Sequence, residues 1–500
     1  MKHRPGIGTF GVIVVAAVGI LVATTYSEGK PQSDLSLRLE SFNINLDPAF
    51  ISDTQSRRIV DMLHAKLVAS NERGEFFPQL AESWSWNNNL SLRLKLKPGQ
   101  LFSNGKTVTS ADAVYSLCRL VQPGAPYGWL FSNIVKQTDN TGKAATCTGL
   151  HSVDSNTLDI EVSSDPGRLL PSLASSTSAI IPADSKPGEY GSVAGAGPYE
   201  IEQIAAGSRV VLKARPGGPL MPMANHVTFQ LVQDDSAAAT LFRNGQLDAI
   251  EVVNPTLRRQ LFASDGSSLV RDARVIETNV HQIRLLIFNE ASLAKSIIVS
   301  SDQIHEWVKT YTGQIDAEGV AKRFSPLTTP IQTSYFPARK VAIRDKYTGP
   351  QPDGRGRAEI ISENDPYSDS IAAALPSTIG GVNVTHVGLE KGVLISRLLK
   401  KDFDIASITL EAMLAHRAYW LAFFEPGSPF TIFGTPLEGL LPSGSDQANP
   451  DIQNAKQIDQ RGNWFILFQE RHSLLLQHWT TGESFLATGL VNYATMGTTR

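Results

Sequence analysis

The chain has 500 residues, of which 42 % are hydrophobic and 19 % are charged, and its formal net charge is −3. A chain of this length and composition can bury a large core and should divide into two or three domains. Because it carries no sustained run of Lys or Arg, we expect neither nucleic acid nor an anionic membrane surface as a partner.

The first 29 residues have the layout of an export signal. Lys2, His3 and Arg4 precede an uncharged apolar run over residues 7–23, after which polar residues resume. This order predicts a secretory signal peptide over residues 1–29. The apolar run is also close to the length that crosses a bilayer, so an uncleaved anchor in the inner membrane stays open as an alternative.

The next segment predicts a strand, a polar loop and a helix. Alternating leucines from Leu35 indicate the strand, and the loop that follows contains Asn43, Asn45 and Asp47 before a proline. A helix is expected from about Asp53 to Ala69, because apolar residues recur there at helical spacing.

Residues 77–120 hold the most ordered local signals. Leu90, Leu92, Leu94 and Leu96 alternate with polar residues, which predicts a half-buried strand with all four leucines on one face. Pro-Gly and Asn-Gly pairs then predict two tight turns, at residues 98–99 and 104–105.

A capped helix is predicted directly after these turns. Thr109 can cap it, and Asp112 stands three residues on, in the acidic position of a capping box. The spacing of its apolar residues indicates a buried face, made of Ala111, Val114, Tyr115 and Cys118.

The chain contains two cysteines, Cys118 and Cys147. In an oxidising compartment, two cysteines in one subdomain favour a disulfide, and the alternative is a pair of buried thiols. Neither arrangement would take part in catalysis.

Later segments alternate between strands and helices. Residues 199–214 predict a strand pair, residues 227–250 a βαβ-like unit, and residues 284–289 a further strand. Residues 354–405 predict two helix and strand repeats, as an α/β lobe with a mostly parallel sheet requires. A closing helix is expected from about Ile452 to Leu476.

The order of the motifs between Pro78 and Leu117 resembles a known family. Pro-Gln-Leu-Ala-Glu-Ser-Trp, Lys-Pro-Gly, Phe-Ser-Asn-Gly and Thr-x-x-Asp-Ala-Val-Tyr-Ser-Leu follow one another here. The same order is found in the extracellular solute-binding proteins of family 5. These proteins are the peptide, oligopeptide and nickel receptors of bacterial ABC importers.

The resemblance implies an α/β, two-lobed periplasmic-binding-protein fold of type II, the large peptide-receptor type, with an extra subdomain inserted in the first lobe. It places the first lobe at residues 30–265, with the inserted subdomain at about 60–160. The second lobe follows at 270–480, and a C-terminal tail at 481–500 returns to the first lobe.

The resemblance also points to residues at the mouth of an interlobe cleft. Asn43 and Asn45 are candidate ligand contacts, and the alternative is that they form local Asx turns. Tyr127 and Trp129 belong to an aromatic cluster that lies beside the cleft in some members of the family. The alternative for these two aromatic residues is that they are part of the core.

A loop over residues 420–430, which begins with Trp420, resembles the loop that lines the cleft. In the family's peptide receptors an aspartate of this loop pairs with the α-ammonium group of the ligand, a contact worth about 1.5 to 3 kcal/mol. Phe423 occupies that position here, which argues against a peptide with a free amine.

An inserted stretch before this loop carries three further candidates. Glu411 could supply the missing anion and Arg417 could bind a carboxylate, and His416 lies in the same stretch. The alternative is that these side chains are simply solvated.

We therefore predict a periplasmic substrate-binding protein of an ABC importer. It would capture a small solute, peptide-like or other, by hinge closure and deliver it to the permease subunits. The alternative is a membrane-tethered sensory or scaffold receptor that is not coupled to import. We expect a monomer without a cofactor or a metal site, and not an enzyme, since no His-x-x-x-His pair and no Gly-x-Ser-x-Gly motif is present.

Overall fold

The fold is known from a computed structural model that describes most of the chain. The described residues are 34–71, 74–122, 125–138, 145–186, 188–215, 217, 221–252, 255–289, 324–325, 357–364, 378–379, 382–411, 464–486 and 488–499. The predicted export segment, residues 1–29, lies outside them.

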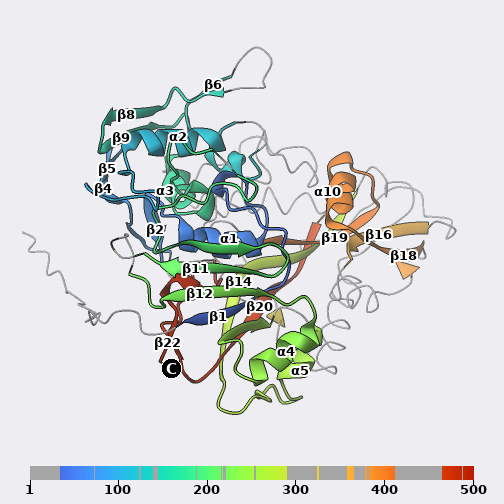
Figure 1. Ribbon diagram of the computed structural model, residues 1–500. Coiled ribbons are helices and arrows are strands. Elements are labelled where there is room, and N and C mark those ends of the chain that lie inside the picture. Colours follow the sequence, from blue (N-terminus) through green and yellow to red (C-terminus); the bar gives the residue numbers. More distant parts are fainter. Residues whose placement is uncertain are drawn as a thin grey trace, which may run out of the picture.

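One mixed sheet of twelve strands runs through the described part of the molecule (Figure 1). In spatial order its strands are β10 (Tyr199–Ala205), β11 (Arg209–Ala214), β12 (His226–Leu231), β1 (Leu35–Leu39), β13 (Ala249–Val252), β20 (Trp464–Leu476), β14 (Arg274–Phe288), β19 (Ile405–Glu411), β16 (Arg357–Glu363), β18 (Val382–Leu389) and β17 (Thr378–Ile379), with β15 (Phe324–Ser325) paired to β20.

The first part of the sheet is built around β1. Its leucines Leu35, Leu37 and Leu39 are all buried, and β1 pairs in parallel with both β12 and β13. The helix α4 (Asp235–Arg243) connects these two neighbours. The βαβ-like unit predicted for residues 227–250 is therefore present.

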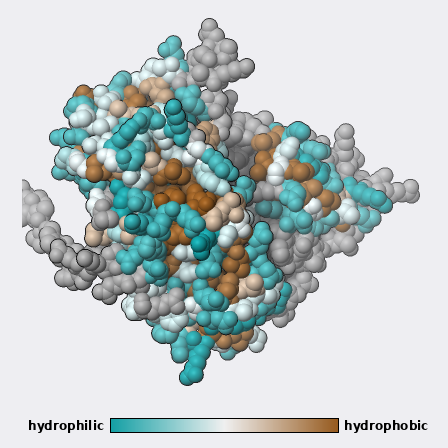
Figure 2. Space-filling model, viewed as in Figure 1, coloured by the Kyte–Doolittle hydropathy of each residue, from teal (hydrophilic) through white to brown (hydrophobic). Residues whose placement is uncertain are grey.

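The second part of the sheet consists of β16 to β19. β16 pairs in parallel with β18 and with β19, and α10 (Lys391–Lys400) leads from β18 to β19. This is the parallel α/β arrangement that the sequence predicts. Figure 2 shows apolar side chains over α10, where Val393, Ile395 and Leu399 are each about half exposed.

Two long strands, β14 and β20, join the two parts. They pair with each other in an antiparallel way from Arg274 to Ile287. The register of this pairing shifts between Asn279 and Ile283, and again between Arg284 and Leu285. β20 also pairs with β13 in the first part, and β14 also pairs with β19 in the second. The chain thus passes between the parts within hydrogen-bonded strands rather than in loops.

The helix predicted over residues 452–476 is wrong for its described half, since residues 464–476 form β20. The triplet Leu474, Leu475 and Leu476 is fully buried. A strand that is covered on both faces needs no polar alternation, so its apolar run can be mistaken for a buried helix.

The helix α1 (Thr54–Leu63) is shorter than the predicted 53–69. Asp53 caps it by accepting a hydrogen bond from the Ser56 amide. It stops at His64, whose Nε2 lies 3.2 Å from the Leu46 carbonyl oxygen and 3.0 Å from that of Ser192. The remaining apolar residues of the predicted helix enter a strand instead, β2 (Val68–Ser70).

A separate four-stranded sheet lies in the range predicted for the inserted subdomain. Its strands are β4 (Ala81–Asn88), β5 (Ser91–Leu96), β9 (Thr157–Glu161) and β8 (Leu150–Asp154). Leu92, Leu94 and Leu96 are buried, as the alternation predicts. Leu90 is not on this face: it is 42 % exposed and lies in the turn, where its amide donates to Asn88.

The helix α2 (Ser110–Leu120) packs on this sheet, and its predicted capping box is present between Thr109 and Asp112. Of the predicted face, Val114 and Cys118 pack against the core while partly buried, whereas Ala111 is exposed. The fully buried side chains of α2 include Ala113, Leu117 and Leu120. The small residues Ser110 and Ser116 are buried as well.

The remaining elements are short. They are β3 (Phe76–Pro78), β6 (Gln137–Thr138), β7 (Ala145–Thr146), β21 (Thr480–Thr481), β22 (Gly497–Thr498), α3 (Leu169–Leu173), α5 (Pro255–Leu261), and the 3-10 turns η1 (Pro48–Phe50), η2 (Gly128–Phe131), η3 (Pro166–Arg168), η4 (Ser176–Ser178) and η7 (Tyr493–Thr495). Within the described ranges, no helix is both long enough and apolar enough to cross a membrane.

Cys118 and Cys147 form a disulfide in the structure, with their Cα atoms 5.7 Å apart. The bond ties α2 to the segment that leads into β8. It therefore closes a loop within the range predicted for the inserted subdomain, with a sequence separation of 29 residues.

A buried ion pair fixes α1 to the first part of the sheet. The Arg58 guanidinium lies 2.6 Å from Glu251 of β13, and the Tyr493 hydroxyl donates to the same carboxylate over 2.6 Å. The His472 ring lies 3.8 Å from it. Burial alone would raise the pKa of Glu251, but the charge of Arg58, helped by His472 and Tyr493, outweighs burial and lowers this pKa to about 2.

Replacing both cysteines (C118S/C147S) should lower the free energy of unfolding of the inserted subdomain by about 3 kcal/mol, the typical effect of closing a loop of this length. Hydrogen exchange of the α2 amides and thermal melts would measure this loss. A reductant should lower the melting temperature of the natural protein and leave the melting temperature of the double variant unchanged. Equal α2 protection in the two proteins would contradict the prediction.

The ionised Glu251 carboxylate should raise the free energy of unfolding. This contribution is fully present above the pKa of the unfolded state, near 4.5, and is lost as the pH falls towards the folded-state pKa of about 2. E251Q should remove this part of the acid dependence, and should cost about 3 to 5 kcal/mol near neutral pH because Arg58 stays charged and buried. Urea unfolding at a series of pH values measures both effects. E202Q, at an exposed glutamate, is the control and should behave like the natural protein.

Candidate functional site

A polar cluster lies where the first part of the sheet meets the second. We call Thr54, Arg57, Tyr127 and Glu411 the Glu411 cluster. The Arg57 guanidinium pairs with the Glu411 carboxylate, and the Thr54 hydroxyl donates to the second oxygen of that carboxylate over 3.0 Å. Three distant segments of the chain therefore meet here: α1, the residue before η2, and the end of β19.

The burial of these side chains is unequal. Arg57 is 4 % exposed, whereas Glu411 is 29 % exposed. Glu411 is thus held in a defined orientation while a fraction of its surface stays accessible.

The electrostatics of the cluster keep Tyr127 neutral. Burial raises the pKa of the Tyr127 phenol to about 12, and the negative charge of Glu411 acts in the same direction, while Arg57 acts against it. A neutral phenol can donate a hydrogen bond to a ligand oxygen. The cluster therefore combines an accessible carboxylate with an aromatic hydroxyl.

The other predicted residues of the first part lie in different settings. The Asn45 side chain accepts a hydrogen bond from the Asp47 amide over 3.0 Å, which is the Asx turn given as its alternative role. Asn43 is exposed. Trp129 is partly buried and packs against the main core, as Tyr127 also does.

Four predicted residues, His416, Arg417, Trp420 and Phe423, lie outside the described residues. Their roles stay predictions. Of the three candidates in the inserted stretch, only Glu411 belongs to the described part of the chain.

Sequence reasoning missed the two α1 residues of the Glu411 cluster, Thr54 and Arg57. Arg57 and Arg58 are neighbours on one helix, and nothing in the sequence tells which of them pairs with β13 and which with β19. The sequence also does not reveal the partner of Arg119, whose guanidinium lies 2.9 Å from the Asp47 carboxylate and fixes the loop before α1. A pairing over hundreds of residues leaves no local pattern.

An open hollow of about 520 Å³ lies elsewhere, between β10 and the loop of residues 182–194. Its lining carries charges of both signs, including Lys106, Asp184, Lys186 and Glu189, and shares no residue with the Glu411 cluster. In the described ranges, no group of three or more His, Cys, Asp or Glu side chains is placed to hold a metal ion.

Comparison with known proteins gives the family context of this fold. The family described as bacterial extracellular solute-binding proteins, family 5 (middle), matches residues 75–298. The periplasmic murein peptide-binding protein MppA of Escherichia coli is 25 % identical over 272 residues, which are 50 % of each chain. The periplasmic oligopeptide-binding protein OppA of Escherichia coli is 25 % identical over 232 residues, or 44 % of this chain and 42 % of OppA. The matches thus span about half the length of these relatives or less.

Solved structures match nearly the whole chain. The ABC transporter substrate-binding protein CtaP of Listeria monocytogenes has a TM-score of 0.72 at 17 % identity and covers 94 % of this chain and 100 % of its own. OppA of Haemophilus influenzae, in complex with the peptide RPPGFSPFR, has a TM-score of 0.71 at 14 % identity with the same coverage. The predicted two-lobed α/β fold is confirmed.

Replacing Glu411 (E411Q) should lower the pKa of Tyr127 from about 12 towards its ordinary value, because Glu411 helps to raise it. The 13C chemical shift of the tyrosine Cζ atoms, followed against pH, reports this titration. Tyr199 serves as a matched control, since its pKa is raised by burial in β10 and should not change. An unchanged Tyr127 titration would contradict the electrostatic contact.

Proposed function

Because the model of the bacterial extracellular solute-binding proteins of family 5 matches residues 75–298, we propose that the chain belongs to this family and is the periplasmic receptor of an ABC importer. It captures a small solute between the two lobes and delivers it to permease subunits by hinge closure. The protein acts as a monomer and performs no chemistry on its ligand. The Glu411 cluster carries this proposal, since it brings an accessible acidic group to the boundary between the lobes.

The lobe bounds of the proposal are those expected from the sequence. The first lobe takes in residues 30–265 with the subdomain at about 60–160, the second takes in 270–480, and the tail at 481–500 returns to the first. A hinge near residues 279–283 is consistent with the strands β14 and β20, because the register of their pairing shifts there.

We further propose that Glu411 takes the place of the family's ligand-binding aspartate, whose position Phe423 occupies. The ligand then carries a cationic group, such as an ammonium, that approaches the accessible side of the Glu411 carboxylate. Tyr127 belongs to the same cluster, and Asn43, Trp129, His416, Arg417 and Trp420 stay further candidates for ligand contact. The relative MppA, whose name states that it binds murein peptide, supports a peptide-like ligand.

Tethering of the receptor to the inner membrane through residues 7–23 is a second proposal, carried by the apolar run in that segment. Cell fractionation with and without this segment distinguishes the two forms. Release of the full-length protein by osmotic shock would rule out the tether.

A ligand screen tests the proposed function. Free-amine peptides, N-blocked peptides, sugars, opines and metal chelates would be added to the protein in thermal-shift assays, where a ligand at a hundred times its dissociation constant adds about 2.7 kcal/mol of stability. We expect compounds with a free ammonium to raise the melting temperature. E411Q should weaken their binding by about 10- to 150-fold, the effect of losing a charge-assisted hydrogen bond.

Two other outcomes carry information. If only N-blocked or uncharged compounds raise the melting temperature, the receptor function holds and the proposed role of Glu411 is wrong. If no compound raises the melting temperature, the result argues against the proposed importer function. E202Q, which removes an exposed charge from β10, controls for a general effect of net charge.

A further inference from the structure

The buried His64 ring holds three segments of the chain together. His64 follows the last residue of α1, and its Nε2 atom lies 3.2 Å from the Leu46 carbonyl oxygen and 3.0 Å from that of Ser192. Both neighbours are acceptors, so Nε2 carries the proton and donates to them. His64 is only 2 % exposed, and the contacts are therefore shielded from water.

The other ring nitrogen is placed for a neutral imidazole. Within the described part of the chain, the Nδ1 atom of His64 is buried and has no hydrogen-bond partner. The Gly195 backbone lies against it, since a Cβ atom at Gly195 would be 2.7 Å from Nδ1. A second proton on Nδ1 would thus be a buried donor without an acceptor, on a ring that has become positively charged.

Two carboxylates act on the ring, and each has a cationic partner. Asp47 lies 2.9 Å from Arg119. Asp61 of α1 lies 3.3 Å from Lys66. Both carboxylates favour a charged ring, but burial outweighs them and lowers the pKa of His64 to about 4.

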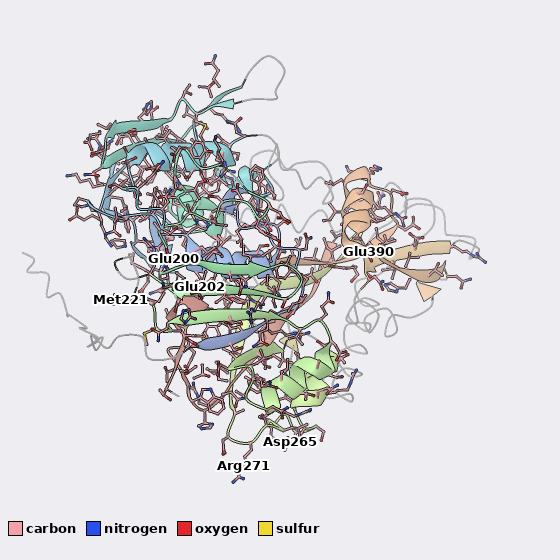
Figure 3. All side chains as sticks on the ribbon, viewed as in Figure 1. Glu200, Glu202, Met221, Asp265, Arg271 and Glu390 are labelled. Carbon is pink, nitrogen blue, oxygen red and sulfur yellow. A yellow bond between two sulfur atoms is a disulfide. The ribbon has the colours of Figure 1, made fainter. Side chains whose placement is uncertain are left out.

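The charged side chains of the other neighbouring segments are at the surface. Lys186 and Glu189, on the loop that contains Ser192, are exposed and line the open hollow described above. On β10, which packs against α1, Glu202 is exposed and Glu200 is partly exposed (Figure 3). The two carboxylates of the previous paragraph are therefore the charges that bear most on the ring.

His64 fixes the loop that carries two candidate ligand contacts. The Leu46 amide of this loop donates to the Tyr190 carbonyl oxygen over 2.7 Å. At Gly191, a Cβ atom would come within 2.6 Å of the Asp47 nitrogen, so the two loops touch backbone to backbone. The His64 ring binds both loops to the end of α1.

We propose that neutral His64 is the positioning residue for the loop of residues 43–47, and that protonation of its ring in acid releases this loop. The proposal rests on the proposed function, because Asn43 and Asn45 of the loop are candidate ligand contacts of the receptor. A charged ring needs water around it and an acceptor for Nδ1, and both become available when the loop moves away. Acid then leaves the two asparagines without a fixed position.

The direction and size of the effect follow from the two pKa values of His64. The ring has a pKa of about 4 when the loop is closed, and it regains the ordinary value of 6.5 when the loop is open. The open loop therefore binds a proton more readily, and the closed loop is favoured fully only above pH 6.5. Between pH 7 and pH 5 the open population should rise about 20-fold.

Hydrogen exchange of the natural protein without ligand measures this opening. After correction for the intrinsic exchange rate, protection of the Leu46 amide should fall about 20-fold between pH 7 and pH 5. The Asn364 amide, which donates to the Leu389 carbonyl oxygen over 2.8 Å in the second part of the sheet, is the control and should keep its protection. Equal behaviour of the two amides would overturn the proposal.

Nitrogen-15 spectra of the histidine rings report the proton directly. The His64 ring should stay in the neutral form with its proton on Nε2 at pH 5, and should gain a second proton only near pH 4. A ring that is charged at pH 6 while the Leu46 amide keeps its full protection would overturn the proposal.

His64→Gln separates the titration from the hydrogen bonds. The glutamine amide nitrogen can occupy the place of Nε2 and donate to the same carbonyl oxygens, but it does not titrate. This variant should keep the protection of the Leu46 amide at pH 7 and lose the fall at pH 5. His151→Gln, at a half-exposed histidine, is the control and should keep the acid response of the natural protein.

His64→Leu removes the donor as well. Protection of the Leu46 amide should then be low at both pH values, whereas a merely space-filling role of the ring would leave it high. An acid response of natural size in His64→Gln would also overturn the proposal. None of these measurements needs a ligand, so a failure here leaves the proposed receptor function intact, and a failure of the ligand screen leaves this proposal open to its own test.

Discussion

The ion pair between Arg58 and Glu251 is the interaction on which the arrangement of the first lobe depends. It is largely buried, and it joins α1, β13 and the C-terminal turn η7 through one carboxylate. A buried charge without its partner is strongly unfavourable. The packing of each of the three elements therefore depends on the presence of the other two. Everything on α1, including Arg57 and Thr54, takes its position from this pair.

The strands β14 and β20 set the second constraint. They belong to both lobes and hydrogen-bond to each other across the boundary, so the lobes cannot drift apart as domains on a flexible linker do. The register of their pairing shifts twice, between Asn279 and Ile283 and between Arg284 and Leu285. Gln282, which pairs with the last residue of β19, lies in the first of these intervals. Movement confined to that point is a rotation, which is the kind of motion that hinge closure needs.

Local signals in the sequence predicted the local structure well. The capping box at Thr109, the strands of residues 199–214, and the parallel strands β16, β18 and β19 with the helix α10 formed as expected. Predictions failed where tertiary contacts outweigh periodicity, as in β20, which is covered on both faces, and in α1, which ends at His64. The Glu411 cluster was predicted only in part, because Arg57 reaches Glu411 through the fold and not through any spacing along the chain.

The adjacent arginines of α1 limit how this protein can change in evolution. Successive residues of an α-helix point about 100° apart, so Arg57 and Arg58 reach two different carboxylates, Glu411 and Glu251, only in their present order. Inserting or deleting one residue between Asp53 and Arg57 would turn both side chains away from their carboxylates at once. Length changes should therefore accumulate in the surface loops of related proteins, while the number of residues between the helix cap and the arginine pair stays constant.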